Sequence, residues 1–178
     1  NDHFRRVVNS ADLVTTDGMP LVWLLRKMGV DDAARVYGPD LMLRVCEAAQ
    51  DQGIPVGFYG GHADYLQRLI SNMTLRYPRL NVSYAYAPPF TNLDTTQDDR
   101  VVDSIKASGA RIVFVSLGCP RQERWMLQHK GRVRAVMLGV GAAFDFYSGR
   151  VRQAPSWVQR CGLEWLYRLI HEPRRLFL

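Results

Sequence analysis

The first residue whose type and position could support chemistry is an aspartate that precedes a glycine. Asp17 and Gly18 separate residues 12–16, which have the pattern of a short strand, from residues 19–28, which have a helical pattern. A carboxylate at such a turn is commonly the N-cap of the helix. At the rim of a cleft it can instead act as a general base that takes a proton from an acceptor hydroxyl. From the residue types alone, both interpretations of Asp17 stay open.

Two glycine-containing segments follow later strands of the predicted pattern. Gly60 and Gly61 open a helix, where they form either a tight turn or a place at which backbone N–H groups approach phosphate oxygens. Residues 139–144 lack the third glycine of a dinucleotide fingerprint and follow a late strand, which argues against a nicotinamide cofactor. Asp145 comes next, either as a loop cap or as a group that binds a ribose or a base edge.

The acidic residues, cysteines and histidines give no metal-binding pattern. No two acidic residues stand in a D-x-D or E-x-D arrangement, and the three cysteines and four histidines are scattered. We therefore expect no metal and no cofactor. If a diphosphate leaves during a reaction, arginines and helix N-termini must stabilise its charge. Arg35 and Arg121 are candidates, although solvated surface charge is the ordinary role of an arginine.

The net charge of +6 is concentrated near the end of the 178-residue sequence. Residues 150–178 contain six arginines against two glutamates, with Trp157, Trp165, Tyr167 and Phe177 among them. Basic and aromatic residues together suit an anionic partner, which can be a membrane surface, a diphosphate or a nucleic acid. No recognised nucleic-acid-binding module accompanies them, so we expect no nucleic acid. No apolar run approaches the roughly 20 residues that a membrane-spanning helix needs.

Strand and helix patterns alternate along the chain. Strands are predicted at residues 12–16, 54–59, 80–87, 111–117 and 133–140, the last two as buried strands. Helices are predicted at residues 19–28, 39–52, 62–77, 94–108, 119–129 and 156–170. This order predicts an α/β fold, with a Rossmann-like, mostly parallel sheet flanked by helices. Ligands of such sheets bind beyond the carboxyl ends of the strands, where the residues singled out above lie.

Six ordered motifs then give a specific resemblance. They are residues 15–20 (TTDGMP), 35–41 (RVYGPDL), 117–123 (LGCPRQE), 139–145 (GVGAAFD), 152–155 (RQAP), and 162–169 (GLEWLYRL) with 172–175 (EPRR). Together they resemble the WecG/TagA/CpsF glycosyltransferases over nearly the whole chain. The resemblance implies an inverting, metal-independent transfer from a UDP-sugar to a polyprenyl-diphosphate-linked acceptor, in cell-surface polysaccharide or teichoic acid synthesis.

The resemblance also implies roles for individual residues. Asp17 falls on the catalytic aspartate of the family. The implied substrate-binding positions are Arg35 and Gln122 near the sugar and diphosphate, and Asp145, Pro89 and Phe90 near the nucleoside. Arg168, Arg174 and Arg175 fall in a C-terminal appendage thought to close over the site and touch the membrane. Gly60 and Gly61 stay substrate-binding candidates from their position at the start of a helix alone.

Two departures from the family pattern qualify these expectations. The Thr-x-Asn segment that usually precedes the aspartate is absent, and the appendage usually extends beyond Leu178. We therefore expect a truncated chain, with a glycosyltransferase domain at residues 1–155 and a basic helical appendage at residues 156–178. The expected location is cytoplasmic, peripheral on the inner face of a bacterial membrane. The alternative function is a nucleotide-sugar epimerase or dehydrogenase. The donor sugar (N-acetylmannosamine, its uronic acid or glucose), the acceptor saccharide and any homo-oligomer are left open.

Overall fold

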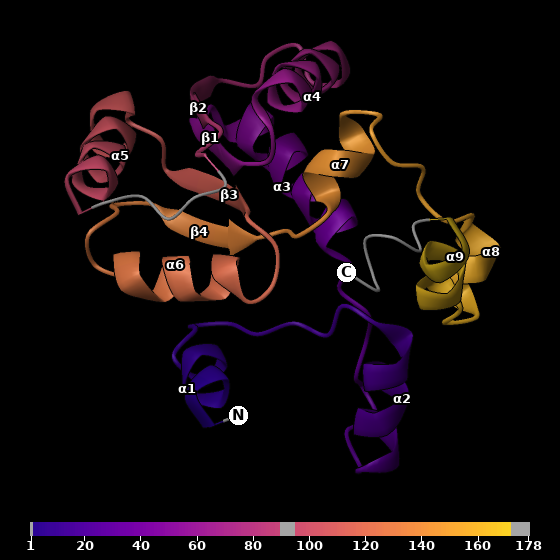
Figure 1. The fold of residues 1–178 in the computed structure, drawn as a ribbon. Helices are drawn as coiled ribbons and strands as arrows, with labels where there is room; N and C mark the ends of the chain where they lie inside the picture. Colours follow the sequence, from indigo (N-terminus) through magenta and orange to yellow (C-terminus); the bar gives the residue numbers. More distant parts are fainter. Residues whose placement is uncertain (1, 90–94, 172–178) are drawn as a thin grey trace. The chain divides into compact units, whose positions relative to one another are not determined.

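The centre of the protein is a four-stranded parallel sheet, seen in a computed structural model that describes residues 2–89 and 95–171. The strands β1 (Val56–Gly60), β2 (Val82–Tyr86), β3 (Ile112–Ser116) and β4 (Val136–Gly139) lie in the order β2-β1-β3-β4 (Figure 1). All three pairings are parallel, and Phe58 stands opposite Phe114 in the register of the two central strands. The predicted α/β class and parallel sheet are confirmed.

The described residues also form nine helices. They are α1 (Asp2–Asn9), α2 (Met19–Lys27), α3 (Gly38–Gln52), α4 (Ala63–Arg76), α5 (Thr95–Ser108), α6 (Arg121–His129), α7 (Ala143–Tyr147), α8 (Ser156–Arg160) and α9 (Glu164–His171). The chain divides into two compact units. Unit 1 comprises Asn1–Val14 and Gly38–Val151, and unit 2 comprises Thr15–Tyr37 and Arg152–Leu178. The predicted boundary between residues 155 and 156 falls inside unit 2.

The central strands β1 and β3 of unit 1 are largely buried, and their alternate residues pack on opposite faces of the sheet. On one face, the stacked rings of Phe58 and Phe114, with centroids 5.4 Å apart, pack among buried side chains of α3, α4 and α7. On the other face, Tyr59 stacks on Trp125 of α6 at 4.3 Å, beside buried residues of α5. The two apolar layers fix the positions of the carboxyl ends of β1 and β3.

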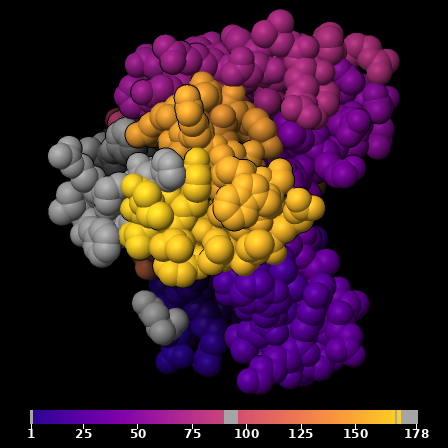
Figure 2. Space-filling model, turned by 90° about the vertical axis from the view of Figure 1, so that its right-hand side faces the viewer, coloured from indigo at the N-terminus to yellow at the C-terminus, as the bar shows by residue number. Residues whose placement is uncertain are grey.

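Unit 2 is built from two stretches that are distant in the sequence. The amide of Val36 donates to the Thr16 carbonyl at 2.8 Å, and Arg26 Nε donates to the Ala33 carbonyl at 3.0 Å, which organises residues 15–37 around α2. The turn between α8 and α9 lies against α2, since a Cβ atom at Gly162 would come 2.6 Å from the indole of Trp23. In Figure 2 the yellow surface of α8 and α9 borders the purple surface of α2.

Three predicted features of secondary structure were wrong. Residues 12–16 form no strand: Leu13 and Val14 are 82% and 59% exposed, and no neighbouring strand pairs with them. The predicted helix at residues 156–170 is two helices, because Gly162 at φ +68° interrupts it. The strand β4 was predicted to be buried, but it lies at one edge of the sheet and is only partly covered. A further helix, α7, was not predicted from the sequence.

Candidate functional site

The carboxyl end of β1 forms a turn that only glycine permits. Gly60 has φ +122° and Gly61 has φ +72°, both in the region that favours glycine. The Gly61 amide donates to the Ser116 carbonyl at the end of β3 at 3.0 Å. A Cβ atom at Gly60 would overlap that carbonyl group. The tight-turn interpretation therefore accounts for both glycines, and the Gly61 N–H is already used within the sheet.

Gln122 is a buried residue in the first turn of α6. Its Oε1 accepts from the Gly141 amide at 3.2 Å, and its Nε2 donates to Glu123 Oε1 at 2.9 Å. Ser116 Oγ donates to the Gly141 carbonyl at 2.6 Å, so β3, α6 and the segment after β4 are tied together. Gly139 leaves room for this arrangement, because a Cβ atom there would lie 3.1 Å from Gln122 Nε2.

Glu123, the neighbour of Gln122, is a residue to which sequence reasoning assigned no role. Its Oε2 is buried and has no hydrogen-bond partner among the described residues. Buried acceptors are nearly always satisfied, so this oxygen is suited to a donor group of a ligand or water. Partial burial and, after it, the Glu123 carboxylate raise the pKa of the Cys119 thiol, which disfavours a thiolate nucleophile there.

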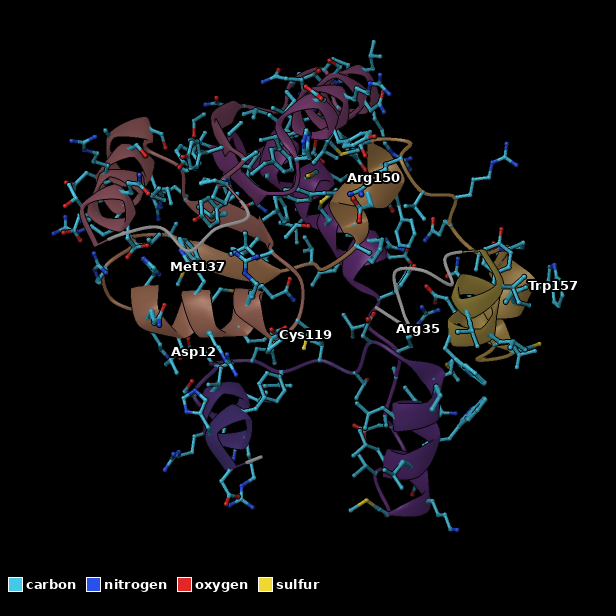
Figure 3. All side chains as sticks on the ribbon, in the orientation of Figure 1. Asp12, Arg35, Cys119, Met137, Arg150 and Trp157 are labelled. Carbon is cyan, nitrogen blue, oxygen red and sulfur yellow. The ribbon has the colours of Figure 1, made fainter. Side chains whose placement is uncertain are left out.

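Asp145 lies in the first turn of α7 rather than in a loop. Its Oδ1 accepts from Arg150 Nη1 at 3.1 Å, and its carbonyl accepts from the Arg150 amide at 3.0 Å. The Arg150 guanidinium in turn lies over the Tyr65 ring of α4, 5.1 Å from its centroid. Arg150, which Figure 3 labels, was not among the predicted site residues. Asp145 is thus held in place by a neighbouring cation.

Asp17 belongs to unit 2 and directly precedes the helix cap. The N-cap of α2 is Gly18, in an extended conformation, so the cap interpretation of Asp17 is not supported. The backbone before it is fixed from residues 34–36: Thr16 Oγ1 donates to the Ala34 carbonyl at 2.5 Å, and the Thr16 carbonyl accepts from Val36. Thr16 belongs to residues 12–16, which the sequence pattern had assigned to a strand.

Arg35 joins the Asp17 backbone to the C-terminal helices of unit 2. Its Nε donates to the Asp17 carbonyl at 2.7 Å, its Nη2 to Glu164 Oε2 at 2.6 Å, and its Nη1 to Gln159 Oε1 at 3.3 Å. The guanidinium also lies over the Tyr37 ring at 4.0 Å. Figure 3 shows Arg35 beside α8 and α9. The network brings two predicted site residues, Asp17 and Arg35, together.

Tyr37 adds a second contact to the Glu164 carboxylate. Its hydroxyl donates to Glu164 Oε1 at 2.7 Å, so both oxygens of Glu164 have a partner. Burial and, after it, the hydrogen bond with Glu164 raise the pKa of Tyr37 above the usual range of a tyrosine. Tyr37 therefore stays protonated and serves as a donor. Neither Tyr37 nor Glu164 was predicted as a site residue, although both lie inside the family-like motifs.

Of the other predicted residues, some are exposed and some lie outside the described part of the chain. Pro89 is exposed in the segment after β2, and Arg121 is exposed at the start of α6. Phe90, Arg174 and Arg175 lie outside the described residues, as does the side chain of Arg168 in α9. Among the described residues, no group of three or more His, Cys, Asp or Glu side chains could hold a metal ion. None of the described helices is both long and apolar enough to cross a membrane.

An open parallel α/β sheet with polar residues after its strands is the architecture of proteins that bind nucleotide-like ligands at the carboxyl edge. Within that class, the protein belongs to the Glycosyl transferase WecG/TagA/CpsF family, whose model matches residues 1–178. The resemblance seen in the six sequence motifs is confirmed.

Two curated relatives carry the same name, N-acetylglucosaminyldiphosphoundecaprenol N-acetyl-beta-D-mannosaminyltransferase. The protein from Bacillus spizizenii (strain ATCC 23059 / NRRL B-14472 / W23) is 34% identical over 98% of this chain and 66% of its own length. That from Bacillus subtilis (strain 168) is 30% identical over 95% of this chain and 64% of its own length. The chain thus spans about two thirds of the length of these relatives.

Proposed function

We propose that the protein is a glycosyltransferase that moves a sugar from a UDP-sugar to a saccharide linked to a polyprenyl diphosphate. The observation that carries this proposal is the family match over residues 1–178. The names of the two relatives supply the substrate class, an N-acetylmannosaminyl group and a diphosphoundecaprenol-linked N-acetylglucosamine. The family match also favours a transferase over the alternative of an epimerase or dehydrogenase.

The proposed reaction is a single displacement with inversion. The acceptor hydroxyl oxygen attacks C1 of the donor sugar and forms the new glycosidic bond. Its proton passes to the Asp17 carboxylate, while the bond between C1 and the diphosphate oxygen breaks and its electron pair leaves with UDP. The beta linkage in the relatives' name supports inversion of an α-linked donor. Asp17 suits the role of base because the backbone on either side of it is held by hydrogen bonds.

The leaving diphosphate is proposed to be stabilised without a metal. Its charge would be met by hydrogen-bond donors and cations of the chain, for which the proposed residues are Gln122, Arg168, Arg174 and Arg175. The residues Asp145, Pro89 and Phe90 are proposed to serve the nucleoside side, and the helix start after Gly60 and Gly61 is proposed to approach the phosphate oxygens. In this scheme residues 1–155 form the catalytic domain and residues 156–178 the closing appendage.

An anionic membrane surface is the proposed partner of unit 2. Trp157 and Trp165 are 62% and 59% exposed, and Trp157 projects outward from α8 in Figure 3. The nearby helix α8 ends with Arg160. Exposed tryptophans beside basic residues are typical of proteins that bind the membrane–water interface. The proposal places the protein on the inner face of the membrane, where a lipid-linked acceptor would be reached.

The transfer is tested by measuring UDP release from a panel of UDP-sugars with a short-chain lipid-diphosphate acceptor. The panel contains UDP-N-acetylmannosamine, its uronic acid and UDP-glucose, and the control acceptor lacks the diphosphate. We expect acceptor-dependent release with one of these donors. The proposal fails if no donor gives release above that seen with the control acceptor.

A further inference from the structure

Each nitrogen of the Arg35 guanidinium is already engaged within unit 2, which leaves fewer N–H donors for a diphosphate. An arginine binds a phosphate group best through two parallel N–H donors on one edge of the guanidinium. In unit 2 all three nitrogens of Arg35 already donate, to Asp17, Glu164 and Gln159. The Tyr37 ring covers one face of the group at 4.0 Å. The geometry is that of a residue which holds other parts of the protein.

The ion pair with Glu164 is also largely shielded from solvent. The side chains of Arg35 and Glu164 are 16% and 17% exposed, and the two charges meet at 2.6 Å. A pair of this kind is strongly coupled, because removal of one partner leaves the other charge poorly solvated. The second Glu164 oxygen accepts from Tyr37 at 2.7 Å, which fixes the carboxylate against rotation. Glu164 therefore sets the orientation of the guanidinium.

We infer that Glu164 is a positioning residue for Asp17 and acts through Arg35. Glu164 and Tyr37 orient the guanidinium, and the guanidinium holds the carbonyl of Asp17 at 2.7 Å. The Asp17 backbone belongs to no helix or strand, so its orientation depends on such contacts. A general base works only when its carboxylate is held in line with the proton that it takes. The C-terminal segment thus sets the geometry of the catalytic loop, which assigns Arg35 to positioning instead of diphosphate binding.

This inference rests on the proposed function of Asp17. It predicts a different effect of Glu164→Gln from the alternative in which Arg35 binds the diphosphate. If Glu164 positions Asp17, Glu164→Gln should lower kcat by about tenfold, an order-of-magnitude value for a small misplacement of a catalytic group. The Kd of UDP should stay unchanged. If Glu164 instead only occupies an arginine that binds the diphosphate, the same variant frees Arg35. UDP would then bind more tightly, and the inference would be overturned.

The experiment measures kcat, the KM of the donor and the Kd of UDP for Glu164→Gln, Glu164→Ala and Tyr37→Phe. Tyr37→Phe removes only the hydroxyl that fixes Glu164, so it tests the inference if the Glu164 variants fail to fold. The matched control is Asp51→Asn, which removes an exposed ion pair with Arg79 at 2.9 Å in unit 1 and should change none of these values. Unchanged kcat in folded Glu164→Gln and Tyr37→Phe proteins would also overturn the inference.

A double-mutant cycle separates failure of this inference from failure of the proposed function. In Arg35→Lys with Glu164→Gln, the losses of kcat should be clearly less than additive, because both changes break the same chain of contacts. Additive losses would show that the two residues act independently, which contradicts the inference. If Asp17→Asn keeps full turnover, the assignment of the base fails, while the coupling between Arg35 and Glu164 can still be read from the cycle.

Discussion

Gly60 lies at the end of β1, beside the proposed site. Its replacement by alanine should strongly lower the free energy of unfolding of the protein. Gly60 has φ +122°, a sparsely populated conformation that costs a residue with a side chain roughly 1–3 kcal/mol. The added Cβ atom would overlap the Ser116 carbonyl group and lie 3.0 Å from Ser116 N. Forcing atoms into a packed region costs a further 1–3 kcal/mol, roughly. Because β1 and β3 are the central strands and cannot separate easily, we expect a total near the upper end, about 4–5 kcal/mol.

The matched control for this change is Gly53→Ala. Gly53 has φ +65° at the end of α3, but an added Cβ atom would meet nothing within 4 Å. The Gly53→Ala change should therefore lower the free energy of unfolding only by the backbone cost, about 1–2 kcal/mol. Urea unfolding followed by circular dichroism gives both free energies. The reasoning is refuted if Gly60→Ala loses no more stability than Gly53→Ala.

Three further predictions concern the proposed chemistry. Asp17→Asn should lower turnover by about 10²-fold while the fold and UDP affinity stay nearly intact, as steady-state kinetics and UDP titration will show; near-normal turnover would contradict the role of base. Activity should survive excess EDTA, and a loss that manganese or magnesium restores would reveal a metal requirement. Changing Arg168, Arg174 and Arg175 together to alanine should reduce binding to anionic vesicles by about two orders of magnitude, since each basic residue near the surface contributes about 1 kcal/mol. The melting temperature should barely move; an unfolded variant, or one with full membrane affinity, would mean a structural segment.

The strands of the sheet were predictable from the sequence because each is a short run rich in apolar residues. The predicted ranges 80–87, 111–117 and 133–140 contain β2, β3 and β4, and the range 54–59 covers β1 except for Gly60. Apolar residues are continuous in β3, since both faces of this central strand are covered. The α/β class and the family followed from the order of these elements and from six motifs.

Local pattern failed where neighbours decide the outcome. Leu13 and Val14 favour a strand by their types, but a strand needs a partner, and the sheet has none beside them. The helical pattern of residues 156–170 is broken at Gly162, where the close approach to Trp23 needs a residue without a side chain. Nothing in the adjacent sequence indicates that contact.

The candidate site residues also divide into those that the sequence identified and those whose role only the tertiary structure decided. Asp17 and Gln122 were identified from the sequence because their motifs are local and family-like. The role of Arg35 was decided only by the tertiary structure, since its ion-pair partner Glu164 lies 129 positions further along the chain. Residue type and spacing indicate that an arginine can bind a diphosphate. Only the folded chain shows where its N–H groups are already used, because a hydrogen bond depends on distance in space and not on separation in sequence.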